Sequence, residues 1–281
     1  MLVPAQVEEI IDRALAEDLS KGDVTTEALI PRDQRGTASI VVKSKGVLAG
    51  MEVAKRVFHR VDPKLTWKAI LEDGAKVEPG DVVAEIDGSY CSILNSERVA
   101  LNFLQRLSGI ASETNRYVES VKGLPVRIMD TRKTTPGLRL LEKYAVRVGG
   151  GENHRMNLGD GILIKDNHLA ALRSRGFTLR EVVAKARQNA SRQLKIEVEV
   201  KTPQEAEEAA EAGADIIMLD NMPLEDMREA VKSVHGRASI EASGGITLNK
   251  VRATAETGVD FISVGALTHS AKALDISLEF T

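Results

Sequence analysis

The chain has 281 residues, enough for one large domain or two smaller ones that each bury a core. Its composition, 43% hydrophobic and 28% charged with a net charge of -3, is typical of a globular protein and argues against a nucleic-acid-binding or membrane-binding surface. No apolar run approaches the roughly 20 residues of a membrane span.

The chain contains a single cysteine, Cys91, which excludes an internal disulfide and a multi-cysteine zinc site. The N-terminus, "MLVPAQVEEIIDRALAED", is acidic and amphipathic, unlike a signal or transit peptide. Together these features predict a cytoplasmic protein.

The first part of the chain reads as a mixture of helices and strands. Pro4 opens an amphipathic helix, "TASIVVKSKGVLAG" predicts a strand, and "MEVAKRVFHRV" predicts a second helix. Two further strands, "LTWKAI" and "VVAEI", are separated by glycine-containing turns. A long helical pattern then runs from Ser92 to about Val121, and Gly109 is expected to break it in two.

After Gly123, short β-rich runs alternate with helical stretches. The six runs are "VRIM", "ILIK", "IEVEV", "DIIML", "ASIEAS" and "FISVG". This alternation predicts a parallel sheet with right-handed crossovers. A complete eight-fold barrel needs about 250 residues and only about 150 are available, so we expect an open, incomplete barrel of about six strands. A doubly wound sheet is the structural alternative.

Polar residues follow all six predicted strands, at the edge where parallel βα folds bind ligands. Asp130, Arg132 and Lys133 follow the first strand, and Lys165 follows the second. The residues after the remaining strands are Glu199 and Lys201, Asp220 and Asn221, Ser243 to Gly245, and Gly265 with His269. This recurrence predicts a binding site at that edge.

Simpler interpretations remain open for several of these residues. Asp130 and Asp220 could cap the helices that follow them. Glu197 and Glu199 could form the solvent-facing side of an edge strand, although a parallel strand in mid-repeat should be covered on both faces. The glycine run "VGGGE" before His154 and Arg155 could be a flexible link, or it could let backbone approach a ligand closely.

Charge is unevenly distributed along the chain. From Arg127 to Lys165 there are eight Lys or Arg residues against four Asp or Glu, a local charge of +4 in an acidic protein. This segment predicts a small anionic ligand, whereas a solvated helix face would explain only Arg139, Lys143 and Arg147. "ASGGIT" and "VGALTH" open helices after the last two strands, which is typical of a phosphate site formed by backbone N–H groups.

Taken together, "DTRKTTPGLRLLEKYAVRVGGGENHR", "LIKDNH", "EVEV", "LDN", "EASGGI" and "VGALTHS" resemble the quinolinate phosphoribosyltransferase family. The likeness extends over nearly the whole chain, including "GDVTT" and "SERVALNFLQRLSGIA". It implies an α/β class fold with an N-terminal α/β sandwich domain over residues 1–109, joined by a C-terminal tail over 271–281, and an open α/β barrel catalytic domain over 110–270.

The resemblance also implies a role for each matching residue. Lys133, Lys165, Glu199 and Asp220 would be catalytic, and quinolinate would be bound by Arg98, Arg132, His154, Arg155 and Lys165. The phosphoribosyl pyrophosphate site would comprise Thr131, Lys133, Glu199, Asp220, Ser243, Gly244, Gly245, Gly265, Ala266 and His269. Mg²⁺ would enter mainly with the pyrophosphate donor, with Glu199 and Asp220 as candidate ligands.

The implied reaction transfers a phosphoribosyl group to quinolinate with loss of CO₂, without a protein nucleophile. The family also implies a homodimer, or a higher oligomer, in which Arg98 reaches the partner subunit's site. Two alternatives remain open: a non-catalytic phosphate or nucleotide sensor on the same scaffold, and a molybdenum-transport-associated paralogue. "IKDNH" at Lys165 to His168 argues against the paralogue.

Overall fold

The computed structural model describes residues 4–281, so the first three residues of the predicted first domain lie outside the described residues. The chain divides into two compact units. The first unit comprises residues up to Asn115 together with Thr134–Gly150 and Ala266–Thr281. The second comprises Arg116–Lys133 and Gly151–Gly265.

The first unit is built on a four-stranded antiparallel sheet with the order β12-β1-β5-β3. The strands are β1 (Arg35–Val42), β3 (Thr66–Ala69), β5 (Val82–Ser89) and β12 (Ile276–Phe280), with a separate pair formed by β2 (Gly46–Val47) and β4 (Lys76–Val77). β1 is buried continuously from Ala38 to Val42, so both of its faces are covered along this stretch. β12, the last strand of the chain, pairs with β1 and so completes the sheet of the first unit.

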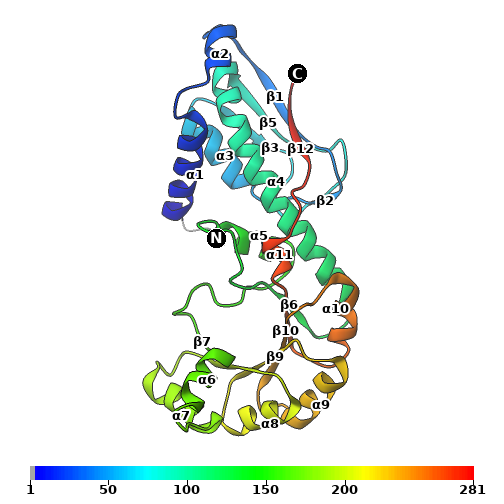
Figure 1. The fold of residues 1–281 in the computed structure, drawn as a ribbon. Coiled ribbons are helices and arrows are strands. Elements are labelled where there is room, and N and C mark those ends of the chain that lie inside the picture. Colours follow the sequence, from blue (N-terminus) through cyan, green and yellow to red (C-terminus); the bar gives the residue numbers. More distant parts are fainter. Residues whose placement is uncertain (1–3) are drawn as a thin grey trace. The chain divides into compact units, whose positions relative to one another are not determined.

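Helices lie alongside this sheet, which makes the unit an α/β sandwich (Figure 1). They are α1 (Pro4–Leu19), α3 (Met51–Val61) and α4 (Tyr90–Ser120, which continues into the second unit), and the unit also contains α2 (Val24–Leu29), α5 (Arg139–Val148) and α11 (Ala266–His269). Ion pairs join α1 to α3, with Arg60 2.7 Å from Asp12 and Arg56 2.6 Å from Glu8.

The expected break at Gly109 is wrong, because α4 is continuous from Tyr90 to Ser120. Gly109 is needed for close packing instead: a Cβ atom there would lie 2.1 Å from the carbonyl oxygen of Lys272. Hydrogen bonds hold that segment against α4, from the Leu274 N–H to the Gln105 carbonyl (2.9 Å) and from the Gln105 side chain to the Ile276 carbonyl (2.7 Å).

The second unit contains a six-stranded, all-parallel sheet with the order β6-β11-β10-β9-β8-β7. Its strands are β6 (Arg127–Met129), β7 (Ile162–Ile164), β8 (Ile196–Val200), β9 (Ile216–Asp220), β10 (Ser239–Ser243) and β11 (Phe261–Ser263). The intervening helices are α6 (Asp166–Arg173), α7 (Leu179–Asn189), α8 (Pro203–Glu211), α9 (Leu224–Val234) and α10 (Leu248–Ala255).

The strand order decides between the two predicted architectures. From β7 to β11 each strand pairs with the next one in the chain, and β6 then pairs with β11. A doubly wound sheet would reverse direction partway, so that alternative is wrong and the open barrel is confirmed. In the part of the chain that the structure describes, no helix has the length and apolar character needed to span a membrane.

Candidate active site

The carboxyl ends of the six parallel strands surround a cavity of about 440 Å³ within the second unit. It is lined by Thr131, Arg132, Lys133, His154, Arg155, Leu163, Lys165, Glu199, Met218, Asp220, Asn221, Glu241, Ser243, Gly244, Gly245 and Ser263. We call this space the rim cavity. Eleven of the predicted site residues meet in it, because short strands deliver their following residues to one edge of the sheet.

One side of the rim cavity is cationic. Arg132, Lys133, Arg155 and Lys165 line it. Burial and the nearby Arg132 guanidinium lower the pKa of Arg155, an effect that Glu197 partly opposes. Two guanidinium groups held near each other are stabilised when an anion binds between them. This side therefore suits a multivalent carboxylate or phosphate.

Local hydrogen bonds shape the loops that carry these cations. The Thr131 hydroxyl accepts from the Lys133 N–H at 3.0 Å, and the Arg155 guanidinium donates to the Gly161 carbonyl at 3.1 Å. Asp130 is fully buried and accepts hydrogen bonds from the Asn153 side chain (2.5 Å) and the His154 N–H (2.9 Å). The helix-cap interpretation of Asp130 is therefore wrong, since its carboxylate joins the two loops.

The opposite side carries a pair of acids from neighbouring strands. Burial and the nearby Asp220 raise the pKa of Glu199, although Lys165 opposes the shift. The following helix, α9, has Pro223 as its N-cap, so Asp220 does not cap it. Two facing carboxylates accept hydroxyl hydrogen bonds and are suitable ligands for a hard divalent cation such as Mg²⁺.

Gly244 and Gly245 form the turn after β10 with φ angles of +90° and +60°. A Cβ atom on Gly244 would lie 2.5 Å from the Asn221 side chain. Asn221 itself adopts a φ of 52°, donates its N–H to the Ser243 carbonyl (2.9 Å), and donates its side-chain amide to Asp220 (2.9 Å). The turn therefore needs glycine, and its exposed backbone N–H groups are suited to an anion.

Sequence reasoning gave no role to Glu197, Glu241 or Ser263, and it placed Asn221 at the strand ends without assigning it a function. Glu197 and Glu241 are 5% and 0% exposed, so the solvent-facing interpretation of the β8 acids is wrong for Glu197. The available signal was the period of two in "IEVEV", which places Glu197 on the same face as Glu199. That signal does not reveal whether the face is solvent or barrel interior.

Four predicted site residues lie outside the rim cavity lining. Gly265 ends the second unit, whereas Ala266 and His269 belong to α11 of the first unit. Arg98 also belongs to the first unit, on α4, where its side chain is 58% exposed and lies 3.8 Å from Glu97. An exposed ion pair of that length contributes little to stability.

Two sequence profiles of one family match most of the chain. The quinolinate phosphoribosyl transferase N-terminal domain matches residues 23–108, and the C-terminal domain of the same family matches residues 110–279.

Individual relatives agree with these matches. A probable nicotinate-nucleotide pyrophosphorylase [carboxylating] from Bacillus subtilis is 45% identical over 98% of this chain and 94% of its own length. A quinolinate phosphoribosyltransferase [decarboxylating] from Nicotiana glauca is 43% identical over 97% of this chain and 82% of its own. The crystal structure of NadC from Streptococcus pyogenes is 46% identical, with a TM-score of 0.95 over 100% of this chain and 99% of that one.

Proposed function

The chain belongs to the quinolinate phosphoribosyltransferase family, and we propose that its rim cavity binds quinolinate beside phosphoribosyl pyrophosphate. The chain is a carboxylating nicotinate-nucleotide pyrophosphorylase, a phosphoribosyltransferase of NAD biosynthesis. It transfers the phosphoribosyl group to quinolinate with decarboxylation, giving nicotinate mononucleotide, pyrophosphate and CO₂. The observation that carries the assignment of the site is that cations, paired acids and a glycine turn line one cavity.

Quinolinate, a dicarboxylate, belongs on the cationic side. Arg132 can bind one carboxylate through two parallel N–H donors, a geometry that lysine lacks. Arg155 and Lys165 supply further positive charge, and Lys133 faces the leaving pyrophosphate.

Phosphoribosyl pyrophosphate belongs on the side formed by β8 to β11. Glu199 and Asp220 would accept the ribose hydroxyls, and Ser243, Gly244 and Gly245 would donate to the 5-phosphate, assisted by Gly265, Ala266 and His269. The facing carboxylates of Glu199 and Asp220 also fit Mg²⁺ carried by the pyrophosphate. When bound, the ion would neutralise charge on the departing pyrophosphate.

Catalysis then depends on positioning and electrostatics. The cavity holds the pyridine nitrogen in line with C1 of the ribose, and the acids stabilise the oxocarbenium character that develops there. Lys133 and Lys165 stabilise the departing anions. Loss of the 2-carboxylate leaves an electron pair on the ring carbon, which a proton must then occupy.

The proposal is tested by mixing the protein with Mg²⁺, phosphoribosyl pyrophosphate and either quinolinate or nicotinate. We expect CO₂ and nicotinate mononucleotide from quinolinate and no product from nicotinate, because the cationic side is built for two carboxylates. Equal turnover of nicotinate would contradict the assignment of that side. Binding of the donor without release of pyrophosphate would indicate the sensor.

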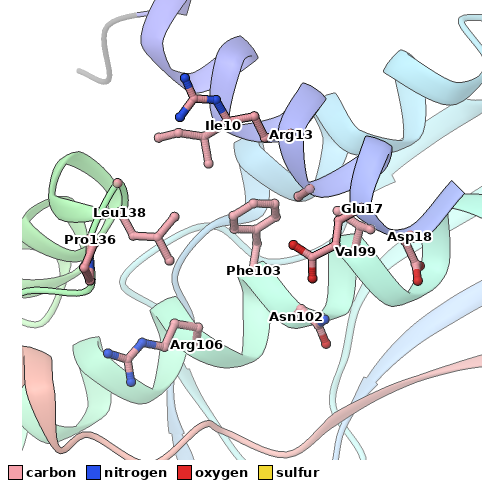
Figure 2. A pocket seen from close by; sticks show the side chains of 12 residues that line it. Ile10, Arg13, Glu17, Asp18, Val99, Asn102, Phe103, Arg106, Pro136 and Leu138 are labelled. Carbon is pink, nitrogen blue, oxygen red and sulfur yellow. The ribbon is translucent and has the colours of Figure 1, made fainter. Parts of the chain in front are cut away.

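We also propose a homodimer in which Arg98 enters the partner subunit's site. Arg98 lies on α4, which together with α1 and the Pro136–Leu138 turn also forms a groove of about 460 Å³ within the first unit (Figure 2). Its walls are apolar at Ile10 and Phe103 and charged at Arg13 and Glu17. Cytoplasmic residence is a further proposal, supported by the single cysteine, which leaves no internal disulfide.

Mixed dimers test the role of Arg98. Arg98→Ala and Lys165→Ala should each be inactive as homodimers, whereas a mixed dimer has one site with both defects and one with neither. Random mixing of equal amounts should recover about a quarter of wild-type activity, since half of the dimers are mixed. Confirmed subunit exchange without recovery would exclude action across the interface.

A further inference from the structure

Three side chains meet beside the rim cavity: His154 and Glu241, which line it, and Glu197. Nε2 of His154 lies 3.2 Å from Oε2 of Glu197 and 3.5 Å from Oε2 of Glu241. Within the described residues, neither carboxyl oxygen of Glu241 makes a hydrogen bond of good geometry, nor does Oε1 of Glu197, although Ser263 and Glu197 lie close enough to Glu241 to shift its pKa. Burying an ionised carboxylate without donors costs several kcal/mol, so this cluster must retain a proton or bind a cation.

The tautomer of His154 favours the proton. One histidine and two carboxylates are a suitable ligand set for a divalent cation. However, the Arg155 N–H donates to Nδ1 of His154 at 2.8 Å, so Nδ1 carries the lone pair. The neutral ring therefore has its hydrogen on Nε2, which faces the two carboxyl groups. A protonated Nε2 cannot bind a metal ion.

Charge then decides which acid keeps its proton. Two ionised acids beside a neutral histidine would repel each other, and Arg155 interacts electrostatically with Glu197. Burial and the neighbouring Glu197 raise the pKa of Glu241 to about 8, although His154 opposes the shift. The strand partners of Glu241, Met218 and Phe261, carry no titratable group. Glu241 is therefore the protonated acid of the cluster.

We propose that Glu241 is the catalytic acid that delivers the proton replacing CO₂ on the pyridine ring, a role that rests on the proposed function. When the carbon–carbon bond to the 2-carboxylate breaks, its electron pair stays on the ring carbon. The O–H bond of Glu241 breaks, the proton forms a C–H bond with that carbon, and Glu241 is left as a carboxylate. His154 acts as a positioning residue, because its Nε2–H can donate to the new carboxylate.

The barrel supplies a way to restore this proton. Glu241, Glu197 and His154 also line a second cavity of about 450 Å³ in the same unit. Arg127, Ile216 and Phe261, the first residues of three strands, line it as well, so it lies toward the amino ends of the sheet. Glu241 thus lines both the rim cavity, in which we place the substrate, and this second cavity. Water in the second cavity can reprotonate Glu241 without crossing the substrate.

The test compares Glu241→Gln with Glu241→Asp in the full-length enzyme. Gln preserves the shape of Glu but has no acidic proton, whereas Asp is shorter but keeps the acid. We expect kcat to fall about 10²- to 10⁴-fold in E241Q and to recover partly in E241D, with less than a threefold change in the dissociation constant of quinolinate. Glu229→Gln, at an exposed acid on α9, is the control and should match the wild type.

A purely structural role predicts the opposite order, with E241Q more active than E241D, and that result would overturn the proposal. A second readout is the hydrogen-to-deuterium ratio on the ring carbon of the product in equal volumes of H₂O and D₂O. Direct protonation by water in E241Q should change that ratio, and an unchanged ratio would also overturn the proposal. Failure of the wild type to make nicotinate mononucleotide would instead overturn the proposed function.

Discussion

Glu142 in the first unit and Glu241 in the second are both fully buried acids, but their surroundings differ. Glu142 accepts hydrogen bonds from the Arg106 guanidinium (2.7 Å) and from the N–H (3.0 Å) and hydroxyl (2.7 Å) of Thr135. Arg106 in turn donates to the carbonyls of Thr268 and Ala271. The Glu241 oxygens have no such donors among the described residues.

The difference separates two uses of a buried charge. An acid surrounded by donors connects parts of the chain, since Glu142 and Arg106 join α4, α5 and the segment after α11. A buried acid without such a set of donors destabilises the folded state. When such an acid lines a cavity, it is a candidate for a catalytic role. Substitution of Glu142 should therefore reduce stability, whereas substitution of an acid that lines the rim cavity should reduce activity.

The largest expected effect is on stability. Glu142→Ala removes a fully buried acceptor and leaves the half-buried Arg106 guanidinium and the Thr135 N–H without it, which should lower the free energy of unfolding by about 3 to 5 kcal/mol. Glu78→Ala, which removes an exposed partner of Lys45 at 2.7 Å, is the matched control and should cost less than about 1 kcal/mol. Urea denaturation measures both. Equal losses would show that burial and partners do not distinguish these acids.

Asp220→Ala should produce the converse result. We expect kcat/KM for phosphoribosyl pyrophosphate to fall about 10²- to 10³-fold, because a preorganised group facing the ribose is lost. The free energy of unfolding should not decrease, since Asp220 is one of the charges that raise the pKa of Glu199. Calorimetry should show quinolinate binding intact. Weakened quinolinate binding with normal donor binding would refute the assignment of this side.

This contrast also marks the limit of sequence reasoning. The residues that follow a strand can be identified from their neighbours along the chain. The patterns "VRIM" followed by "DTRK" and "ILI" followed by "KDNH" therefore correctly predicted residues that line the rim cavity. The open barrel followed from alternating elements and chain length. These inferences need only the neighbours of a residue along the chain.

Features that depend on packing between distant segments were missed. Lys143 was grouped with Arg139 and Arg147 as a candidate solvated helix face, yet it is fully buried. Gly109 was read as a helix break because nothing near it in sequence indicates the approach of Lys272. Glu241 lies in "IEAS", and only closure of the sheet brings it within 3.5 Å of His154.

A smaller effect is expected at the glycine turn, where backbone rather than charge is altered. Gly244→Ala would place a Cβ atom 2.5 Å from the Asn221 side chain at a φ of +90°, whereas at Gly245 (φ +60°) the nearest atom is 3.5 Å away. We expect G244A to cost about 1 to 3 kcal/mol and to raise the KM for phosphoribosyl pyrophosphate. G245A should cost about 1 kcal/mol. Equal costs would mean that Asn221 yields without disturbing the turn.

The last expected effect is the dependence of stability on pH that Glu241 creates. Its pKa of about 8 in the folded chain exceeds the value of about 4.5 when unfolded, so between these limits the folded state binds the extra proton. Stability due to this group is complete below about pH 4.5 and is lost as pH rises toward 8, by at most about 1.4 kcal/mol per pH unit. Glu241→Gln removes this dependence. The unfolding free energy of E241Q minus that of the wild type should therefore increase from pH 5.5 to 7.5 and stay constant above about pH 8.5. Urea denaturation of both proteins across that range measures the difference. Parallel curves throughout would mean that folded Glu241 is already ionised at neutral pH, and the contrast with Glu142 would then lie in geometry alone.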